Sequence, residues 1–191
     1  MSSQNEALCP VHIYIDDSNL VKGGKKEHNS VRLWSRNFWI YDVNELHRII
    51  MQKLNRRGTV NFESPHLHFY GSFLHRNPQI ENLDQENRSN VTVFRCSRNS
   101  MGQEKQVDTK LCVDMVVKAM ATVASQGKCV FVLVSGDSDM IPAVKQAVEC
   151  GFHVHVWSWS KRLSSEFRIL ARQERRVKIF ELDLYLYRLK Q

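Results

Sequence analysis

The sequence predicts an α/β fold with a central, mainly parallel sheet, and two neighbouring segments indicate this class. Val130–Val134 is apolar throughout, as expected of a strand buried on both faces of a parallel sheet. Residues 140–148 follow with apolar side chains at helical spacing and with Pro142 in the first turn, where proline is tolerated. A strand, a tight turn and a helix therefore come in direct succession.

Five further segments read as short strands bounded by turn residues. They are residues 11–15, 66–72, 91–95, 153–159 and 177–180, which gives a sheet of about five to six strands. The segments between them carry helical patterns. We expect a helix from 43 to about 57 with Asp42 as its N-cap, a short helix or loop over 78–89, a helix over 107–120, a helix opening at Ser164, and an amphipathic tail over 182–189.

Carboxylates follow two of the predicted strands. Asp16 ends the first strand, and Asp137 and Asp139 follow the strand at 130–134. Open parallel sheets bind ligands at the carboxyl ends of their strands. Asp108 stands where an N-cap belongs, either facing a neighbouring loop or only capping the helix at 107–120. Asp114 lies six residues further along the same predicted helix and therefore on a different face from Asp108. We rank Asp114 below Asp108 as a site residue.

Acids from separate segments that meet at one sheet edge repel one another. At about 4 Å, two like charges cost on the order of 4 kcal/mol at an effective dielectric near 20. Such a cluster persists if some acids are protonated or if a divalent cation lies among them. Several carboxylates favour Mg²⁺ or Mn²⁺ over zinc, and such ions suit phosphoryl chemistry. Neutral polar groups that could support the acids are Asn19, Ser135 and Ser138.

The chain is basic, with 27 Lys and Arg against 20 Asp and Glu, a net charge of +7. This charge balance indicates a polyanionic partner that binds at a cluster of acidic residues. A requirement for solubility alone also accounts for the net charge. Basic side chains at the rim would hold the phosphates of that partner. The candidates are Lys22, Lys25, Lys26, Arg98, Lys105, Lys110, Lys161 and Arg162.

Residues 22–41 read as a long insertion that opens with a flexible basic loop, Lys22-Gly23-Gly24-Lys25-Lys26. The aromatic residues that follow, among them Trp34, Phe38 and Trp39, either cover the end of the sheet or offer surfaces for base stacking.

Several kinds of protein are excluded or disfavoured. The five cysteines are odd in number and lack CxxC spacing, so we expect reduced thiols in an intracellular protein, cytoplasmic or nuclear. No segment resembles a signal peptide or is long enough to span a bilayer. A phosphate-binding glycine loop and a GxSxG nucleophile elbow are both absent from the sequence.

Three motifs, in order along the chain, resemble those of NYN domains in the PIN-like nuclease superfamily. Residues 13–20, Ile-Tyr-Ile-Asp-Asp-Ser-Asn-Leu, resemble an opening strand followed by Asp-Gly-x-Asn. Residues 105–108, Lys-Gln-Val-Asp, with Val-Asp-Met at 113–115 resemble Lys-Gly-Val-Asp … Val-Asp-Met. Residues 135–142, Ser-Gly-Asp-Ser-Asp-Met-Ile-Pro, resemble Ser-Gly-Asp-x-Asp-Phe-x-Pro. The resemblance runs from about residue 11 to 184, so we expect one domain over 1–191.

The resemblance implies a PIN-like three-layer α/β/α sandwich and a ribonuclease that depends on Mg²⁺ or Mn²⁺, acting on RNA alone or with protein partners in RNA processing. Asp16, Asp108, Asp137 and Asp139 would hold the metal, with Asn19, Ser135 and Ser138 in support. Asp114 matches a further position of the family's motif. Asp17 and Gln106 stand where the family has glycine, so a second hypothesis is a PIN-like module that binds RNA or protein without cutting.

Overall fold

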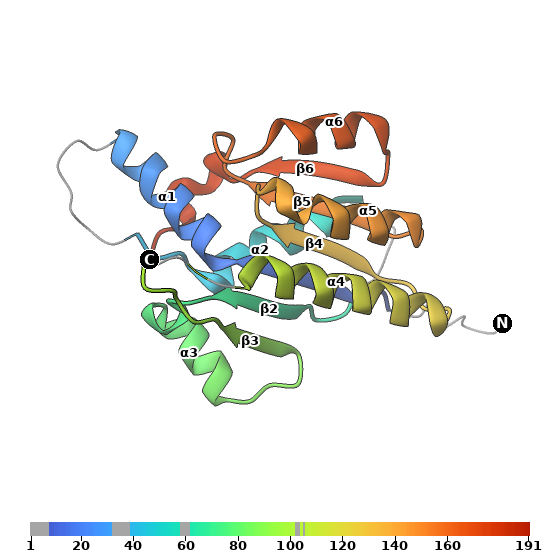
Figure 1. The fold of residues 1–191 in the computed structure, drawn as a ribbon, viewed down its shortest axis with the longest axis horizontal. Helices are drawn as coiled ribbons and strands as arrows, with labels where there is room; N and C mark the ends of the chain where they lie inside the picture. The colour runs from blue at the N-terminus through green and yellow to red at the C-terminus, as the bar shows by residue number, and fades with distance from the viewer. Residues whose placement is uncertain (1–7, 32–38, 58–61, 102–103, 105) are drawn as a thin grey trace.

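The computed structural model describes residues 8–31, 39–57, 62–101, 104 and 106–191. Six strands form one sheet in the order β3-β2-β1-β4-β5-β6, and every pairing is parallel (Figure 1). This confirms the predicted parallel sheet. The strands are β1 (Val11–Asp16), β2 (His66–Gly71), β3 (Val91–Arg95), β4 (Val130–Val134), β5 (His153–Ser158) and β6 (Val177–Glu181).

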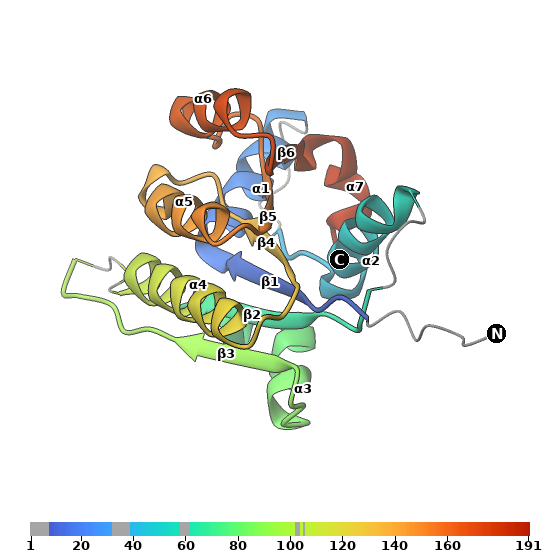
Figure 2. The same ribbon diagram turned by 90° about the vertical axis from the view of Figure 1, so that its right-hand side faces the viewer.

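Helices cover both faces of the sheet, which confirms the three-layer α/β/α arrangement (Figure 2). One face packs against α4 (Val107–Ala124), α5 (Ile141–Glu149) and α6 (Ser165–Gln173). The other packs against α1 (Asp17–Val31), α2 (Val43–Leu54), α3 (Pro78–Gln85) and α7 (Leu186–Leu189). Short 3-10 turns lie at Asn55–Arg57, Leu74–Arg76, Ser138–Met140 and Leu182–Tyr185.

Strand β1 lies in the middle of the sheet and is buried along its whole length. Its side chains alternate between the two layers, because successive residues of a strand point to opposite faces. Ile13 and Ile15 join the core beneath α1 and α2, and Tyr14 joins the core beneath α4. Asp16 has the parity of Tyr14, so the strand directs its carboxylate toward the α4 side.

The expectation of a flexible basic loop after β1 was wrong. Residues 17–31 form the helix α1, and its two glycines lie against buried indole rings. A Cβ at Gly23 would lie 2.0 Å from Cδ1 of Trp159, and one at Gly24 would lie 2.5 Å from Trp39. Here glycine allows close approach of a helix to the aromatic core rather than flexibility.

The aromatic residues at the end of this region pack inside the protein. Trp39 is 2% exposed and Tyr41 is fully buried, so both cover the sheet instead of offering a surface to bases. Trp34 and Phe38 lie outside the described residues.

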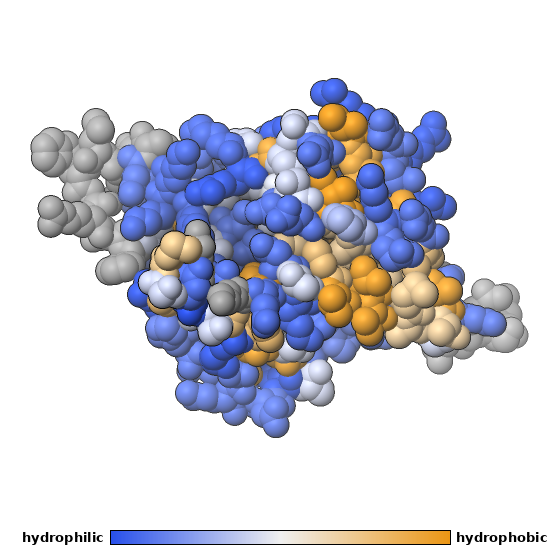
Figure 3. Space-filling model, viewed as in Figure 1, coloured by the Kyte–Doolittle hydropathy of each residue, from blue (hydrophilic) through white to orange (hydrophobic). Residues whose placement is uncertain are grey.

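The surface divides by hydropathy (Figure 3). Hydrophobic side chains gather over α4 and α5, where Val113, Val117, Met120 and Val123 are each about half exposed. The carboxyl end of the sheet, at the left of Figure 3, is mostly hydrophilic. Among the described residues, every helix is too short or too polar to span a bilayer.

Candidate active site

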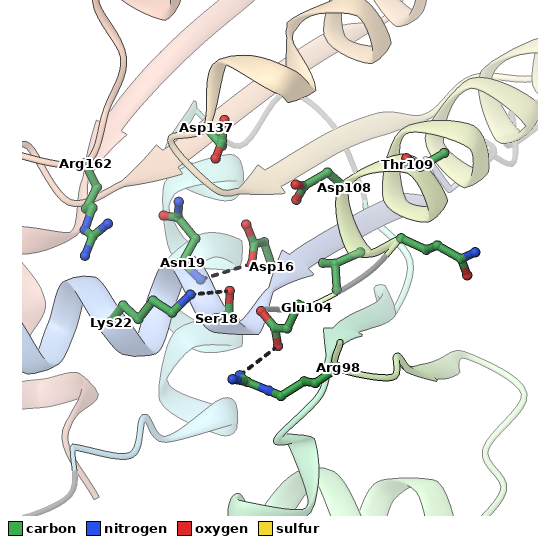
Figure 4. A pocket seen from close by; sticks show the side chains of 12 residues that line it. Asp16, Ser18, Asn19, Lys22, Arg98, Glu104, Asp108, Thr109, Asp137 and Arg162 are labelled. Carbon is green, nitrogen blue, oxygen red and sulfur yellow. Dashed lines mark hydrogen bonds and ion pairs between the residues drawn. The ribbon is translucent and has the colours of Figure 1, made fainter. Parts of the chain in front are cut away.

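A cavity of about 490 Å³ opens at the carboxyl end of the sheet, where the strand order reverses between β1 and β4. Open α/β sheets bind ligands at such a reversal, because the connections on its two sides leave in opposite directions. Figure 4 shows the side chains that line it. They are Asp16, Ser18, Asn19, Lys22, Arg98, Glu104, Gln106, Val107, Asp108, Thr109, Asp137 and Arg162.

Asp16 forms the floor of the cavity and is 3% exposed. Its Oδ1 accepts a hydrogen bond from the backbone N–H of Asn19 at 3.0 Å, in the manner of a helix N-cap for α1. Its Oδ2 accepts one from the Ser135 hydroxyl at 3.1 Å. These two bonds tie the end of β1 to the start of α1 and to the turn after β4, so the orientation of the carboxylate is fixed.

Asp137 reaches the cavity from the turn after β4. Its backbone N–H donates to Ser135 Oγ at 3.3 Å. The residue before it must be glycine, because a Cβ at Gly136 would lie 2.4 Å from the backbone oxygen of Arg162. The Ser-Gly-Asp sequence is therefore explained by a close approach between this turn and the segment that carries Arg162.

Asp108 faces the cavity from the first turn of α4 (Figure 4). It is not the N-cap that its position suggested. The cap residue is Gln106, whose φ of 67° is left-handed and whose side chain makes no capping bond. Glycine adopts this conformation without strain, which gives a physical reason for glycine at this family position. Gln106 itself adopts this left-handed conformation, and Asp108 lies in the cavity lining.

Burial and the charges of neighbouring acids raise the pKa of Asp16 and of Asp108. Burial raises the pKa of Asp16 to about 6, and the nearby Asp108 adds to the shift while hydrogen bonds from Asn19 and Ser135 oppose it. Burial also raises the pKa of Asp108, followed by the charges of Asp137 and Asp139. The cavity thus concentrates negative charge that a bound cation would offset.

The remaining predicted acids and polar groups lie elsewhere. Asp139 is exposed outside the cavity lining, although its charge reaches Asp108. Its backbone N–H donates to Asp137 Oδ1 at 3.1 Å. Ser138 is likewise not in the lining. Asp114 accepts a hydrogen bond from the Tyr70 hydroxyl at 2.9 Å and pairs with Lys110, so it serves the contact between α4 and β2.

Three of the predicted basic residues line the cavity: Lys22, Arg98 and Arg162. Lys22 and Arg162 lie across it from Asp108 (Figure 4). Four others do not line it, and Lys105 lies outside the described residues. Of these four, Lys161 pairs with Glu27 at 2.9 Å and Lys110 with Asp114, while Lys25 and Lys26 are exposed on α1.

Sequence reasoning missed Glu104 because it lies in a loop read only as basic and polar. Its Oε1 accepts hydrogen bonds from the backbone N–H and the hydroxyl of Ser72, at 2.8 and 2.6 Å. Burial alone would raise the pKa of Glu104, but the bonds from Ser72 and Ser18 outweigh burial and lower it. The only signal in the sequence was a glutamate near the Val-Asp motif. A loop has no periodicity from which the direction of a side chain could be predicted.

Asp17, noted only as a departure from glycine, is a second buried carboxylate beside Asp16. Its Oδ1 accepts a hydrogen bond from the Tyr41 hydroxyl at 3.1 Å. Burial raises its pKa to about 7, and the charge of Asp16 adds to the shift. The structure therefore accommodates the departure by giving the extra acid a partner within the core.

The donor set fits a hard divalent cation held partly through water. Among the described residues, no three His, Cys, Asp or Glu side chains are close enough to hold a metal ion together. Carboxylate oxygens are nevertheless the ligands that Mg²⁺ prefers, and Mg²⁺ usually binds through one or two carboxylates, several waters and substrate phosphates. Four buried or half-buried acids line the cavity, and one or two of them can supply such ligands: Asp16, Glu104, Asp108 and Asp137.

The α/β/α sandwich and an acidic cavity at the strand-order reversal define the class as a PIN-like nuclease fold. The sequence model of the NYN domain matches residues 10–175. This chain therefore belongs to the NYN domain family, a PIN-like nuclease family of the ribonuclease type. No curated protein and no solved structure matches the chain.

Proposed function

We propose that this protein is a metal-dependent endoribonuclease that hydrolyses RNA phosphodiester bonds. The observation that carries the proposal is the convergence of Asp16, Asp108 and Asp137 on one cavity that also has basic side chains in its lining. Family membership supports nuclease chemistry and RNA as the substrate. The acids suit a cation, and the basic residues suit a polyanion.

The chain's own residues have separate roles in this proposal. Asp16, Asp108 and Asp137 would hold the cation, and Asp139, outside the cavity lining, would add negative charge that reaches Asp108. A bound Mg²⁺ or Mn²⁺ would polarise the scissile phosphate and favour ionisation of the attacking water. Ser135 and the Asn19 backbone keep the Asp16 carboxylate oriented toward that cation.

The basic side chains Lys22, Arg98 and Arg162 would hold the phosphates of the strand over the acids. In the reaction, the water oxygen bonds to phosphorus and loses a proton, and the ester oxygen leaves and takes one up. Holding the phosphate and the water in line supplies much of the rate enhancement, because the two reactants no longer have to meet by diffusion.

The first test compares cleavage of a labelled RNA by wild type and Asp137→Asn in the presence of Mg²⁺ or Mn²⁺. We expect the variant to lose at least about 100-fold in rate, since it removes one charge from the cation site. Asp84→Asn is a matched control, because Asp84 pairs with Arg95 on the surface away from the cavity. Equal cleavage by wild type and Asp137→Asn would sink the proposal.

A second test addresses where the strand is cut. A circular RNA has no ends, so its conversion to a linear product identifies an endonuclease. Binding of RNA that survives chelation, without product at any metal concentration, would instead identify a module that binds and does not cut.

A further inference from the structure

Three side chains form a stack at the corner between β2 and α3, beside the cavity. Phe73 follows β2, and the guanidinium carbons of Arg76 and Arg98 each lie 3.8 Å from the centroid of its ring. Both guanidinium groups therefore contact the same aromatic ring. We call Arg76, Phe73 and Arg98 the arginine–phenylalanine stack.

The cavity side of the stack is held in place. Arg98 Nε donates to Ser72 Oγ at 2.7 Å, and the guanidinium approaches Glu104 at 3.6 Å. Glu104 is itself anchored by Ser72, and its backbone bridges to that of Arg98. Arg98 also lines the cavity (Figure 4). Its planar group is therefore presented in a fixed orientation beside the acids.

No ion pair explains why Arg76, the other arginine of the stack, lies against Phe73. Arg76 is exposed, and within the described residues it makes no salt bridge. An exposed cation–π contact contributes only about 0.5–1 kcal/mol, and two like charges on one ring oppose it. The arrangement does create planar cationic surfaces at the edge of a cavity that already suits a phosphate.

Guanidinium planes stack on unpaired nucleobases, and guanidinium edges hold phosphates. We propose that the arginine–phenylalanine stack is a base-binding subsite of this protein, in which an unpaired base of the RNA stacks on Arg98 next to the phosphate held over the acids. The inference rests on the proposed function, because it assigns one nucleotide of the substrate to one corner of the cavity.

The test measures RNA binding in the presence of a chelator, so that cleavage does not contribute. The probes are a short fluorescent single-stranded RNA and a series in which an abasic residue replaces each nucleotide in turn. In wild type we expect one position at which loss of the base weakens binding about tenfold, the size expected for one stacked base. In Arg98→Lys and Phe73→Leu the same loss should weaken binding less than about twofold, because stacking is already gone.

The choice of variants and one control keep the result interpretable. Arg98→Lys retains the charge and leaves Phe73 in place, so it tests the planar group even if Phe73→Leu unfolds. Arg88→Lys makes the same change on a surface loop, where Arg88 pairs with Glu86, and should behave as wild type.

The base-binding subsite is wrong if wild type does not bind the single strand, if no abasic position weakens binding, or if both stack variants keep the full penalty. Cleavage of RNA by wild type in any of these cases leaves the proposed function standing. If an abasic position weakens binding only when the stack is intact, and the protein never cuts RNA, the subsite is supported and the proposed function is overturned.

Discussion

Gln106 carries backbone strain at the entrance to the helix that presents Asp108. Its φ of 67° costs an ordinary side chain about 1–2 kcal/mol relative to a right-handed conformation, and glycine avoids most of that cost. We expect Gln106→Gly to raise the free energy of unfolding by about 0.5–1 kcal/mol, because the relieved strain exceeds the entropy that glycine gains in the unfolded chain. The midpoint of urea unfolding measures this.

Gln52→Gly is the matched control, because Gln52 is exposed within the regular helix α2. There glycine should lower the free energy of unfolding by about 1 kcal/mol. Destabilisation of similar size at both positions would show that the turn before Asp108 is not strained.

His155 is a buried titratable group far from the acids. It is 7% exposed, and its Nδ1 has no hydrogen-bond partner among the described residues. Burial, with smaller contributions from the charges of Lys178 and His153, lowers its pKa to about 4. Since the unfolded chain takes up the proton near pH 6.5 and the folded chain does not, this residue makes stability fall as the pH drops from about 6.5 to about 4.

His155→Leu should therefore flatten the acid side of the stability curve by up to about 1.4 kcal/mol per pH unit. It should also stabilise the protein at pH 7, because the buried polar atom without a partner disappears. Urea unfolding at several pH values between 4 and 7.5 measures both effects. An unchanged slope would mean that His155 is protonated in the folded protein.

At the scale of the element, α1 depends on close contact with Trp159. The indole is buried and its Nε1 donates to the Leu20 carbonyl at 2.9 Å, so it cannot move aside freely. We expect Gly23→Ala to lower the free energy of unfolding by about 1–2 kcal/mol, because overpacking outweighs the better helix propensity of alanine.

Thermal unfolding compares Gly23→Ala with Asn29→Ala, a change at an exposed position of the same helix. The control should stay within about 0.5 kcal/mol of wild type. If Gly23→Ala stabilises the protein instead, α1 does not press against the indole.

At the scale of the whole molecule, the acids couple cation binding to pH. The pKa of Asp16 is raised to about 6 from its ordinary 3.8, so its contribution to stability is full below about 3.8 and is lost as the pH rises through about 6. A cation binds the ionised form and restores that loss. We expect Mn²⁺ to raise the melting temperature more at pH 8 than at pH 5, where Asp16 is mostly protonated.

Melting curves with Mn²⁺ and with a chelator, at the two pH values, measure this difference. Asp16→Asn should melt higher than wild type with the chelator at pH 8 and should respond little to Mn²⁺. Asp84→Asn should respond as wild type does. An equal rise in melting temperature with Mn²⁺ at both pH values would show that cation binding does not depend on the ionisation of Asp16.

Much of the fold follows from local pattern. The short apolar runs of β4 and β1 predict buried parallel strands, because burial on both faces leaves a distinct sequence signal. Residues after such strands share one edge of the sheet, so Asp16 and Asp137 could be placed together before any coordinates. Loop 96–106 gave no such signal, and Glu104 was missed there.

The sequence by itself determined the parallel sheet, most of its helices and the edge of the sheet at which Asp16, Asp108 and Asp137 line one cavity. The tertiary structure decided what depends on contacts between distant segments. The residues predicted as a basic loop form part of α1. Their glycines, Gly23 and Gly24, gain contacts with Trp159 and Trp39 only in the folded chain. The tertiary structure also set Arg98 against Phe73, because the direction of a loop side chain is fixed by its neighbours and not by its place in the sequence.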